Sequence, residues 1–248
     1  MPEKALKLVY LSPHLDDVAL SCGGLVWEQT QAGMAVEIWS VCAGDPPPGE
    51  LSTYARSLHA RWDTGPQAIA VRRQEDIESL AILGATARHL AIPDVIYRRS
   101  AKTGTAYVNS DAELFGDVHL EEDALIDRLV TEFAEWLPGE AQVVCPVTLG
   151  HHIDHQIVRA AAERLGRPLW YYADYPYVLE DAVRIAGLLP EGTRMEVYPI
   201  SAGGLQAWQA CVAAHRSQIS TFWPDLESMQ AAIRNYCIQI GGVRLWHG

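Results

Sequence analysis

The chain has 248 residues and a formal net charge of −12; 49% of its residues are hydrophobic and 20% are charged. This balance excludes an intrinsically disordered protein, and the length suits one folded domain spanning residues 1–248. Nucleic acid and anionic membrane surfaces demand a basic face, so the acidic charge and the lack of a strong Lys/Arg cluster argue against both as main partners. A local pair such as Arg98–Arg99 could still hold a small anion.

The N-terminus and the cysteines predict a cytoplasmic protein. The first residues contain no apolar signal-peptide core, and the uncharged stretch 197–214 is interrupted by proline and glycine, so no membrane span is expected. Five cysteines, odd in number and without a C-x-x-C pair, favour reduced core residues over disulfides. The sequence leaves the oligomeric state open, a homo-oligomer included.

Strand-like and helix-like segments alternate over the first 170 residues. Apolar runs predict strands at 6–11, 36–42, 88–92, 142–145 and 168–172. Helical spacing of apolar residues predicts helices at 16–32, 68–83, 120–137 and 154–165. Two long loops, 43–66 and 97–117, carry no pattern that indicates their role. Beyond residue 172 the pattern predicts only a strand near 196–198 and two late helices.

This alternation predicts an α/β fold, a single Rossmann-like domain with a mostly parallel sheet and helices on both faces. Ligands of such sheets bind beyond the carboxyl ends of the strands, so the strand-to-helix junctions are the places to search for a site. Residues 12–17 (Ser-Pro-His-Leu-Asp-Asp) follow the first strand. Residues 150–155 (Gly-His-His-Ile-Asp-His) follow the strand that ends at 145.

These two junctions combine metal-binding residue types at a spacing that suits one site. His14 and Asp17 are three residues apart at a helix start, as are His152 and His155, so each pair can project from one helix face. Imidazole nitrogens and carboxylate oxygens are typical zinc ligands, and three of them with an open position define a catalytic site. We expect Zn²⁺, or another divalent ion, on His14, Asp17 and His155.

That ligand set leaves Asp16 as an unligated carboxylate that can take a proton from an attacking water. His152 is then the candidate that stabilises the oxyanion or protonates the leaving amine, with Asp154 fixing its tautomer. The alternative is that one aspartate caps the helix. Capping uses a single carboxylate, however, and explains neither His14 nor the second cluster.

Both junctions, and the helix between them, resemble motifs of one family. Residues 13–17 (Pro-His-Leu-Asp-Asp) resemble the (A/S)HPDD motif of the PIG-L/LmbE-like deacetylases, and residues 152–155 (His-Ile-Asp-His) resemble their HxDH motif. A leucine and an isoleucine stand where that family often has proline. Arg72 and Glu75 fit its R-x-x-E helix, and Asp94 fits the strand end that follows. The resemblance covers about residues 6–165.

The resemblance implies a zinc hydrolase that removes the N-acetyl group from an N-acetylglucosamine-type sugar or sugar conjugate. The family's metal ligands and general base fall on the residues already singled out: His14, Asp17, His155 and Asp16. Arg72 and Asp94 match positions that face sugar hydroxyls. By themselves they are almost equally well explained as a surface salt bridge and a turn residue.

Other interpretations stay open. The runner-up function is metal-dependent hydrolysis of a non-sugar amide or ester on the same scaffold, a choice that depends on the two long loops. A nucleotide-binding Rossmann protein is disfavoured, because no G-x-G-x-x-G follows the first strand and Gly23 and Gly24 lie within the first helix.

The tyrosines of 171–177 suit sugar stacking and core packing equally. Residues 215–218 (His-Arg-Ser-Gln) fit either a pocket wall or an ordinary helix end.

Overall fold

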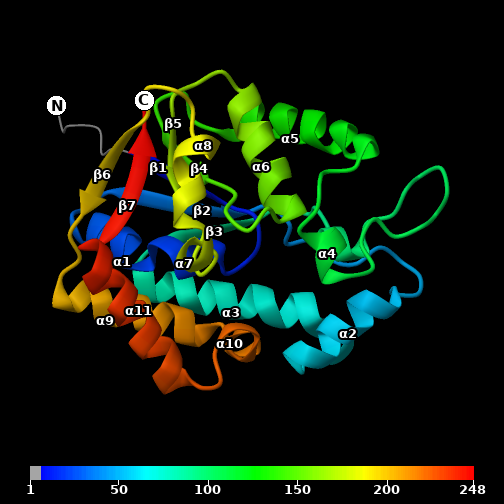
Figure 1. The fold of residues 1–248 in the computed structure, drawn as a ribbon, viewed down its shortest axis with the longest axis horizontal. Coiled ribbons are helices and arrows are strands. Elements are labelled where there is room, and N and C mark those ends of the chain that lie inside the picture. The colour runs from blue at the N-terminus through cyan, green and yellow to red at the C-terminus, as the bar shows by residue number, and fades with distance from the viewer. Residues whose placement is uncertain (1–6) are drawn as a thin grey trace.

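The computed structural model describes residues 7–248, which are built around one seven-stranded sheet (Figure 1). Leu6, the first residue of the expected first strand, lies outside the described residues. In chain order the strands are β1 (Lys7–Ser12), β2 (Ala35–Ser40), β3 (Thr86–His89), β4 (Gln142–Pro146), β5 (Leu169–Tyr172), β6 (Arg194–Tyr198) and β7 (Val243–His247). Across the sheet they follow the order β3-β2-β1-β4-β5-β7-β6.

The first five strands are parallel, and β7 runs antiparallel to both of its neighbours, β5 and β6. In the centre, Tyr10 of β1 pairs with Ile38 of β2 and Val144 of β4. Residues 8–11 are almost fully buried because helices cover both faces, which is why β1 reads as a continuous apolar run. The strand order reverses between β1 and β4, so a ligand crevice is expected at their carboxyl ends.

The α-helices within the described residues are α1 (Asp17–Gln31), α2 (Thr53–Trp62), α3 (Ala68–Leu83), α4 (Asp111–Leu114), α5 (Asp123–Trp136), α6 (Ile153–Arg164), α7 (Val178–Asp181), α8 (Ile185–Leu188), α9 (Ala202–Ala214), α10 (Arg216–Phe222) and α11 (Leu226–Ile240). Short 3₁₀ turns lie at η1 (Gly65–Gln67), η2 (Val95–Tyr97), η3 (Leu120–Glu122) and η4 (Ala182–Arg184). Helices α5 and α6 pack together on one side of the sheet, and α1, α3 and α9 pack together on the other (Figure 1).

The predicted fold class is confirmed, as are all the strands and helices expected before residue 172, within a few residues at their ends. The prediction that residues 43–66 and 97–117 are loops was wrong in part. Helix α2 lies within 43–66 and helix α4 within 97–117. Three late helices follow β6 rather than two, and β7 was not expected. Helix α2 does carry a start signal, since Ser52 accepts a hydrogen bond from the N–H of Ala55 at 3.0 Å.

The late helices pack on the first one through a pair of glycines. A Cβ at Gly23 would lie 2.7 Å from both Cys211 Sγ and Trp208 Cδ1, and one at Gly24 would lie 2.9 Å from the Trp208 ring. Trp208 also donates a hydrogen bond to the carbonyl of Leu20 at 3.1 Å. These glycines therefore serve close packing of α1 against α9 and bind no phosphate.

Two further predictions concerned the state of the cysteines and the absence of a membrane span. All five cysteines are free and buried, as expected of reduced core residues. Among residues 7–248, no helix combines the length and the apolar character needed to cross a membrane.

Candidate active site

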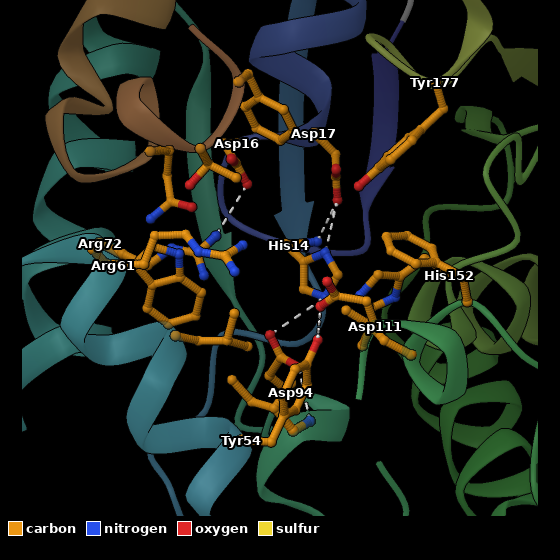
Figure 2. A pocket seen from close by; sticks show the side chains of 18 residues that line it. His14, Asp16, Asp17, Tyr54, Arg61, Arg72, Asp94, Asp111, His152 and Tyr177 are labelled. Atoms are coloured by element: carbon orange, nitrogen blue, oxygen red, sulfur yellow. Dashed lines mark hydrogen bonds and ion pairs between the residues drawn. The ribbon is translucent and has the colours of Figure 1, made fainter. Parts of the chain in front are cut away.

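The two expected junctions meet at the crevice where the strand order reverses (Figure 2). The β1–α1 junction carries His14, Asp16 and Asp17, and the β4–α6 junction carries His152 and His155. The first four of these line a cavity of about 180 Å³. Side chains from α2, α4 and α10 complete its wall, so the two segments once expected as loops contribute to the site.

Three side chains expected to bind a metal converge at this crevice. Asp17 Oδ2 lies 3.3 Å from His14 Nδ1 and 3.4 Å from His155 Nε2, and each residue is no more than 8% exposed. The same oxygen accepts the backbone N–H of His14 at 2.7 Å. Ligand atoms bound about 2.1 Å from a tetrahedral ion lie about 3.4 Å apart, so the distance from Asp17 Oδ2 to each imidazole nitrogen fits a shared metal.

The far nitrogen of each imidazole has a carboxylate partner. His14 Nε2 lies 3.1 Å from Asp154 Oδ2 and 3.6 Å from Asp94 Oδ2. His155 Nδ1 lies 2.6 Å from Asp174 Oδ1. A carboxylate behind an imidazole fixes its tautomer, so Nδ1 of His14 and Nε2 of His155 are left to face Asp17.

Two groups of three described side chains have ligand atoms within 4.8 Å of one another: His14 with His152 and His155, and His14 with Asp94 and Asp154. Both groups contain His14, and neither contains Asp17. The carboxylates of the second group are tied to protein donors, since Asp94 accepts the N–H of Ile96 and Asp154 accepts the N–H of Val95. We therefore interpret the second group as the support of the His14 ring.

Asp16 and Asp17 are neighbours that point in different directions. Figure 2 shows Asp17 directed toward His14 and Asp16 directed toward Arg72. Asp16 precedes the first residue of α1, but its side chain makes no capping hydrogen bond, which removes the alternative explanation for an aspartate there. Its Oδ1 accepts a hydrogen bond from Arg72 at 3.1 Å, and both side chains are buried in the cavity wall.

Arg72 and Asp94 both line the cavity, as expected from the resemblance. Neither lies on the open surface, since each is 5% exposed. Arg72 stacks its guanidinium 4.8 Å from the Trp62 ring, while Asp94 also holds the turn at η2 through Ile96. The surface-salt-bridge interpretation of Arg72 is therefore wrong, and the turn interpretation of Asp94 is correct alongside its place in the cavity.

Asp154 contacts the His152 ring, as expected, but through its backbone N–H and not through its carboxylate. That carboxylate instead contacts His14, Arg98 and the N–H of Val95. The tautomer of His152 is set by the backbone of Asp154, whose N–H donates to His152 Nδ1 at 3.1 Å. This follows from the position of His152 directly before α6, where a side chain normally accepts a free helix N–H. Nε2 of His152 therefore carries the proton.

The loop that leads into α6 is strained. Thr148 and His151 have φ of 72° and 64°, a left-handed conformation that side chains other than glycine rarely adopt. Gly150 has φ of 81°, and a Cβ there would lie 2.7 Å from the Tyr177 ring. Such strain is common where a loop must aim functional side chains. His151 itself points away, with Nδ1 3.2 Å from the carbonyl of Gly116, so it does not join the cluster.

Electrostatics at the crevice favour a positive charge. Burial by itself would lower the pKa of His14, but Asp94, Asp154 and Asp17 raise it well above its usual value. Burial also acts to lower the pKa of His155, yet Asp17 and Asp174 raise it to about 9. Burial would raise the pKa of Asp17, but His155 and His14 hold it well below its usual range. Asp17 thus stays ionised and attracts cations.

His152 behaves differently from the other two imidazoles. Burial, reinforced by the positive charge of His14 and His155, holds the pKa of His152 well below its usual value. Its ring is therefore neutral at pH 7, with a proton on Nε2 and an acceptor at Nδ1.

Two supporting residues were missed from the sequence. Asp174 follows β5 and could have been found by its position, because β5 ends at the same sheet edge as β1 and β4. Arg98 was interpreted as part of an anion site, but it is buried between Asp154 and Glu122 and is bonded to both. No local pattern around Arg98 indicates that pairing, which depends on two segments distant in sequence.

The tyrosine-rich segment 171–177 divides between core and site. Tyr172 is fully buried and donates to the carbonyl of Leu11 at 3.1 Å, and Tyr175 is buried among C-terminal aromatic rings. Tyr177 lines the cavity and lies edge-on to Phe115 and His155. One ring of the segment is therefore available to a ligand.

A doubly wound α/β fold with a buried His/Asp cluster at its switch point defines a Rossmann-like protein with a metal-type site. The family model described as PIG-L, GlcNAc-PI de-N-acetylase, matches residues 9–165, and the chain belongs to this family. The matched range includes both junctions and the Arg72 helix. It ends before Asp174 and the late helices.

Named relatives and solved structures agree with this family. The chain is 30% identical over 186 residues to 2'-N-acetylparomamine deacetylase of Niallia circulans, covering 68% of this chain and 66% of the relative. It is 28% identical to the protein of the same name from Streptomyces fradiae, covering 75% and 63%. The chain thus spans slightly less than two thirds of the length of these curated relatives.

The structural likeness extends over nearly the whole chain. A teicoplanin-bound deacetylase from the biosynthesis of teicoplanin superposes with a TM-score of 0.79 at 26% identity, covering 97% of each chain. The zinc-inhibited form of teicoplanin deacetylase Orf2 gives 0.76 at 26% identity with the same coverage. The late helices, outside the family match, therefore also have counterparts in a solved deacetylase.

Proposed function

We propose that this protein is a divalent-metal-dependent N-deacetylase, with zinc as the metal, that releases acetate from an N-acetylglucosamine-type sugar or sugar conjugate. The observation that carries the proposal is the pair of adjacent aspartates. Asp17 stands between two imidazole nitrogens at ligand spacing, and Asp16 faces the cavity without joining that cluster. A ligand beside a separate base is the arrangement that metal-assisted hydrolysis requires.

The donor set fits a divalent ion. His14, Asp17 and His155 supply two nitrogens and one oxygen, a set typical of catalytic zinc. Their buried carboxylate neighbours raise the pKa of both histidines, so a metal would replace protons that the site already attracts. When bound, the ion supplies Lewis acidity that polarises the acetyl carbonyl and makes a nearby water easier to deprotonate.

The protein's own residues complete the reaction. Asp16 accepts a proton from the water that attacks the acetyl carbon, and Arg72 holds its carboxylate toward the cavity. His152, neutral and protonated at Nε2, donates a hydrogen bond to the oxygen on which negative charge develops. The C–N bond then breaks, and Asp16 returns its proton to the leaving amine, which frees acetate and the amino sugar.

The cavity and the relatives support a sugar as substrate. The cavity of about 180 Å³ is smaller than the roughly 300 Å³ and above typical of sites for drug-sized ligands, which favours a single sugar unit inside it. Tyr177 and Phe222 present rings to it, and Asp94 presents a carboxylate that suits a hydroxyl. The relatives are named 2'-N-acetylparomamine deacetylase and teicoplanin deacetylase, and these names describe removal of an acetyl group, in the first case from nitrogen.

The test combines metal analysis of the purified protein with amine release from several substrates. We expect about one divalent ion per chain, loss of turnover after chelation, and recovery on adding one equivalent of Zn²⁺. Because a similar deacetylase exists in a zinc-inhibited form, Zn²⁺ should also be added in excess, beside Mn²⁺ and Co²⁺. N-acetyl sugars should release amine, whereas simple acetamides and acetate esters should not. Turnover that persists without metal would contradict the proposal, and preference for an ester would favour the runner-up.

A further inference from the structure

Helix α10 lies in the part of the chain beyond the family match and forms one wall of the cavity. It contributes Gln218, Thr221 and Phe222 and packs against α2, which supplies the adjoining wall. Of the segment 215–218, whose role the sequence left open, Gln218 thus lines the pocket.

A buried glutamate holds the start of this helix in place. Glu75, 2% exposed on α3, accepts the backbone N–H of Ser217 at 2.9 Å and its hydroxyl at 2.6 Å. Glu75 stands one helical turn after Arg72, which holds Asp16. A single helix therefore positions both the proposed base and the α10 wall.

The same contacts determine which way the Gln218 amide faces. The Ser217 hydroxyl donates its only proton to Glu75, so toward Gln218 it can act only as an acceptor. Gln218 Nε2 donates to it at 2.9 Å. The carbonyl oxygen is thereby turned the other way, and it accepts no hydrogen bond from any residue within 7–248. Gln218 is 6% exposed and lines the cavity, so this acceptor is available to a ligand there.

Thr221 stands one turn further along the same face of α10. Its Oγ1 is buried in the cavity wall and has no hydrogen-bond partner among the described residues. Buried polar atoms without partners are costly in folded proteins, and a ligand hydroxyl or amide can satisfy them.

We propose that Gln218, assisted by Thr221, determines substrate specificity by accepting a hydrogen bond from a hydroxyl or N–H group of the substrate sugar. This inference rests on the proposed deacetylase function and names the group that distinguishes a hydroxylated sugar from other acetamides. A site built to hydrogen-bond a hydroxyl rejects analogues that lack it, because its own polar group is then left unpaired.

The experiment compares Gln218→Met with Gln206→Met in the metal-loaded full chain. Gln218→Met keeps the side-chain volume and removes the acceptor, while Gln206 is exposed on α9 and serves as the matched control. With methyl N-acetylglucosaminide, we expect kcat/KM of Gln218→Met to fall roughly 10-fold, mainly through KM, and the control to stay unchanged. Metal content and melting temperature identify any variant that misfolds.

A second measurement separates recognition from a structural effect. Against the 3-, 4- and 6-deoxy sugars, wild type should lose activity on the one whose missing hydroxyl meets Gln218, and Gln218→Met should lose nothing further. Ser217→Ala, which frees the amide to turn, should show a smaller loss of about 3-fold. Wild-type kcat/KM and unchanged deoxy selectivity in Gln218→Met would overturn the inference.

Failure of the proposed function has a different signature, because wild type would then release no amine from any N-acetyl sugar. In that case N-acetylglucosamine binding, followed by ligand-observed NMR, still tests Gln218. Weaker binding to Gln218→Met than to wild type would support the inference, and equal or absent binding would overturn it.

Discussion

The His/Asp cluster at the ends of β1 and β4 differs from the outer wall formed by α2 and α10 in how its polar groups are satisfied. In the cluster, His14 and His155 each contact a carboxylate through both ring nitrogens. On the outer wall, the Gln218 carbonyl oxygen and Thr221 Oγ1 have no partner among residues 7–248. The cavity lies between these two regions.

This difference in hydrogen bonding distinguishes the groups that we expect to carry out the reaction from those that we expect to recognise the substrate. A catalytic group must be held in one orientation before substrate arrives, which requires its other atoms to be bonded within the protein. A recognition group must instead keep a free donor or acceptor for the ligand. Substitutions in the cluster should therefore abolish metal binding or turnover, whereas those in the outer wall should change affinity by much smaller factors.

The largest effect is expected at Asp16, compared with its neighbour Asp17. Asp16→Asn removes the proposed base but no ligand, so turnover should fall roughly 10²–10⁴-fold while metal stays bound. Asp17→Ala removes a ligand, so metal content and turnover should fall together. Metal analysis and kinetics on both variants check this. Loss of metal in Asp16→Asn with retention in Asp17→Ala would reverse the two roles, and full activity in both would refute the hydrolase.

His152 provides the internal control of that assignment, because it lies close enough to His14 and His155 to compete as a ligand. His152→Ala should keep the metal and lose turnover by about 10²-fold or more, the usual cost of losing an oxyanion donor. If His152→Ala lost the metal instead, the ligand set would consist of the three histidines.

A smaller effect is expected at Asp174, which contacts the cluster only through His155. Asp174→Asn preserves shape but weakens the partner of His155 Nδ1, so metal affinity should fall roughly 10–100-fold. Competition with a chromogenic chelator measures this affinity. Asp111→Asn is the matched control, because Asp111 also lines the cavity but is exposed, and its carboxylate accepts a hydrogen bond from the Tyr54 hydroxyl. Equal affinities in the two variants would show that Asp174 does not support the ligand.

The fold was predictable wherever the pattern is local. The central strands are buried on both faces and read as apolar runs, and α3 ends at Gly84 in the left-handed conformation that glycine favours. Helix α2 was missed because half of its residues are polar and only one side meets the cavity. Strand β7 was missed because it depends on pairing with β5 and β6, which are distant in sequence.

The residues of the candidate site could be predicted where two motifs end neighbouring strands, which is how His14, Asp17 and His155 were chosen. The hydrogen bonds that support these side chains could not be predicted. Arg98 bonds to Asp154, 56 residues away, and no spacing rule reports such a distance. Asp174 could have been placed at this sheet edge by its position after β5, but its bond to His155 could not. Gln218 was left open because its orientation depends on Glu75, 143 residues earlier, through Ser217. Long-range hydrogen bonds thus set limits on what a single sequence can tell.

The next effect in size is expected at Arg72, which belongs to the cavity wall but holds the proposed base. Arg72→Gln removes the charged hydrogen bond to Asp16, so kcat/KM should fall about 10–30-fold with metal retained, since such a bond contributes about 1.5–2 kcal/mol. Arg73→Gln is the control, because its guanidinium bonds to Ala43 and Asp45 instead. Unchanged kinetics in Arg72→Gln would show that the orientation of Asp16 does not depend on this contact.

The smallest effect is expected at Arg61, on the outer wall. Its guanidinium lines the cavity, yet it makes no hydrogen bond or ion pair with any residue within 7–248, and its side chain is exposed. Arg61→Gln should therefore change the free energy of unfolding by less than about 0.5 kcal/mol. With neutral methyl N-acetylglucosaminide, kcat/KM should change by less than about 3-fold, because an uncharged sugar offers the guanidinium only weak hydrogen bonds.

Arg56→Gln is the control for the loss of one positive charge, because Arg56 is exposed on the same helix and donates a hydrogen bond to the carbonyl of Leu51. A loss above 10-fold in Arg61→Gln alone would mean that the outer wall takes part in the chemistry, and the division between the two regions would then be wrong.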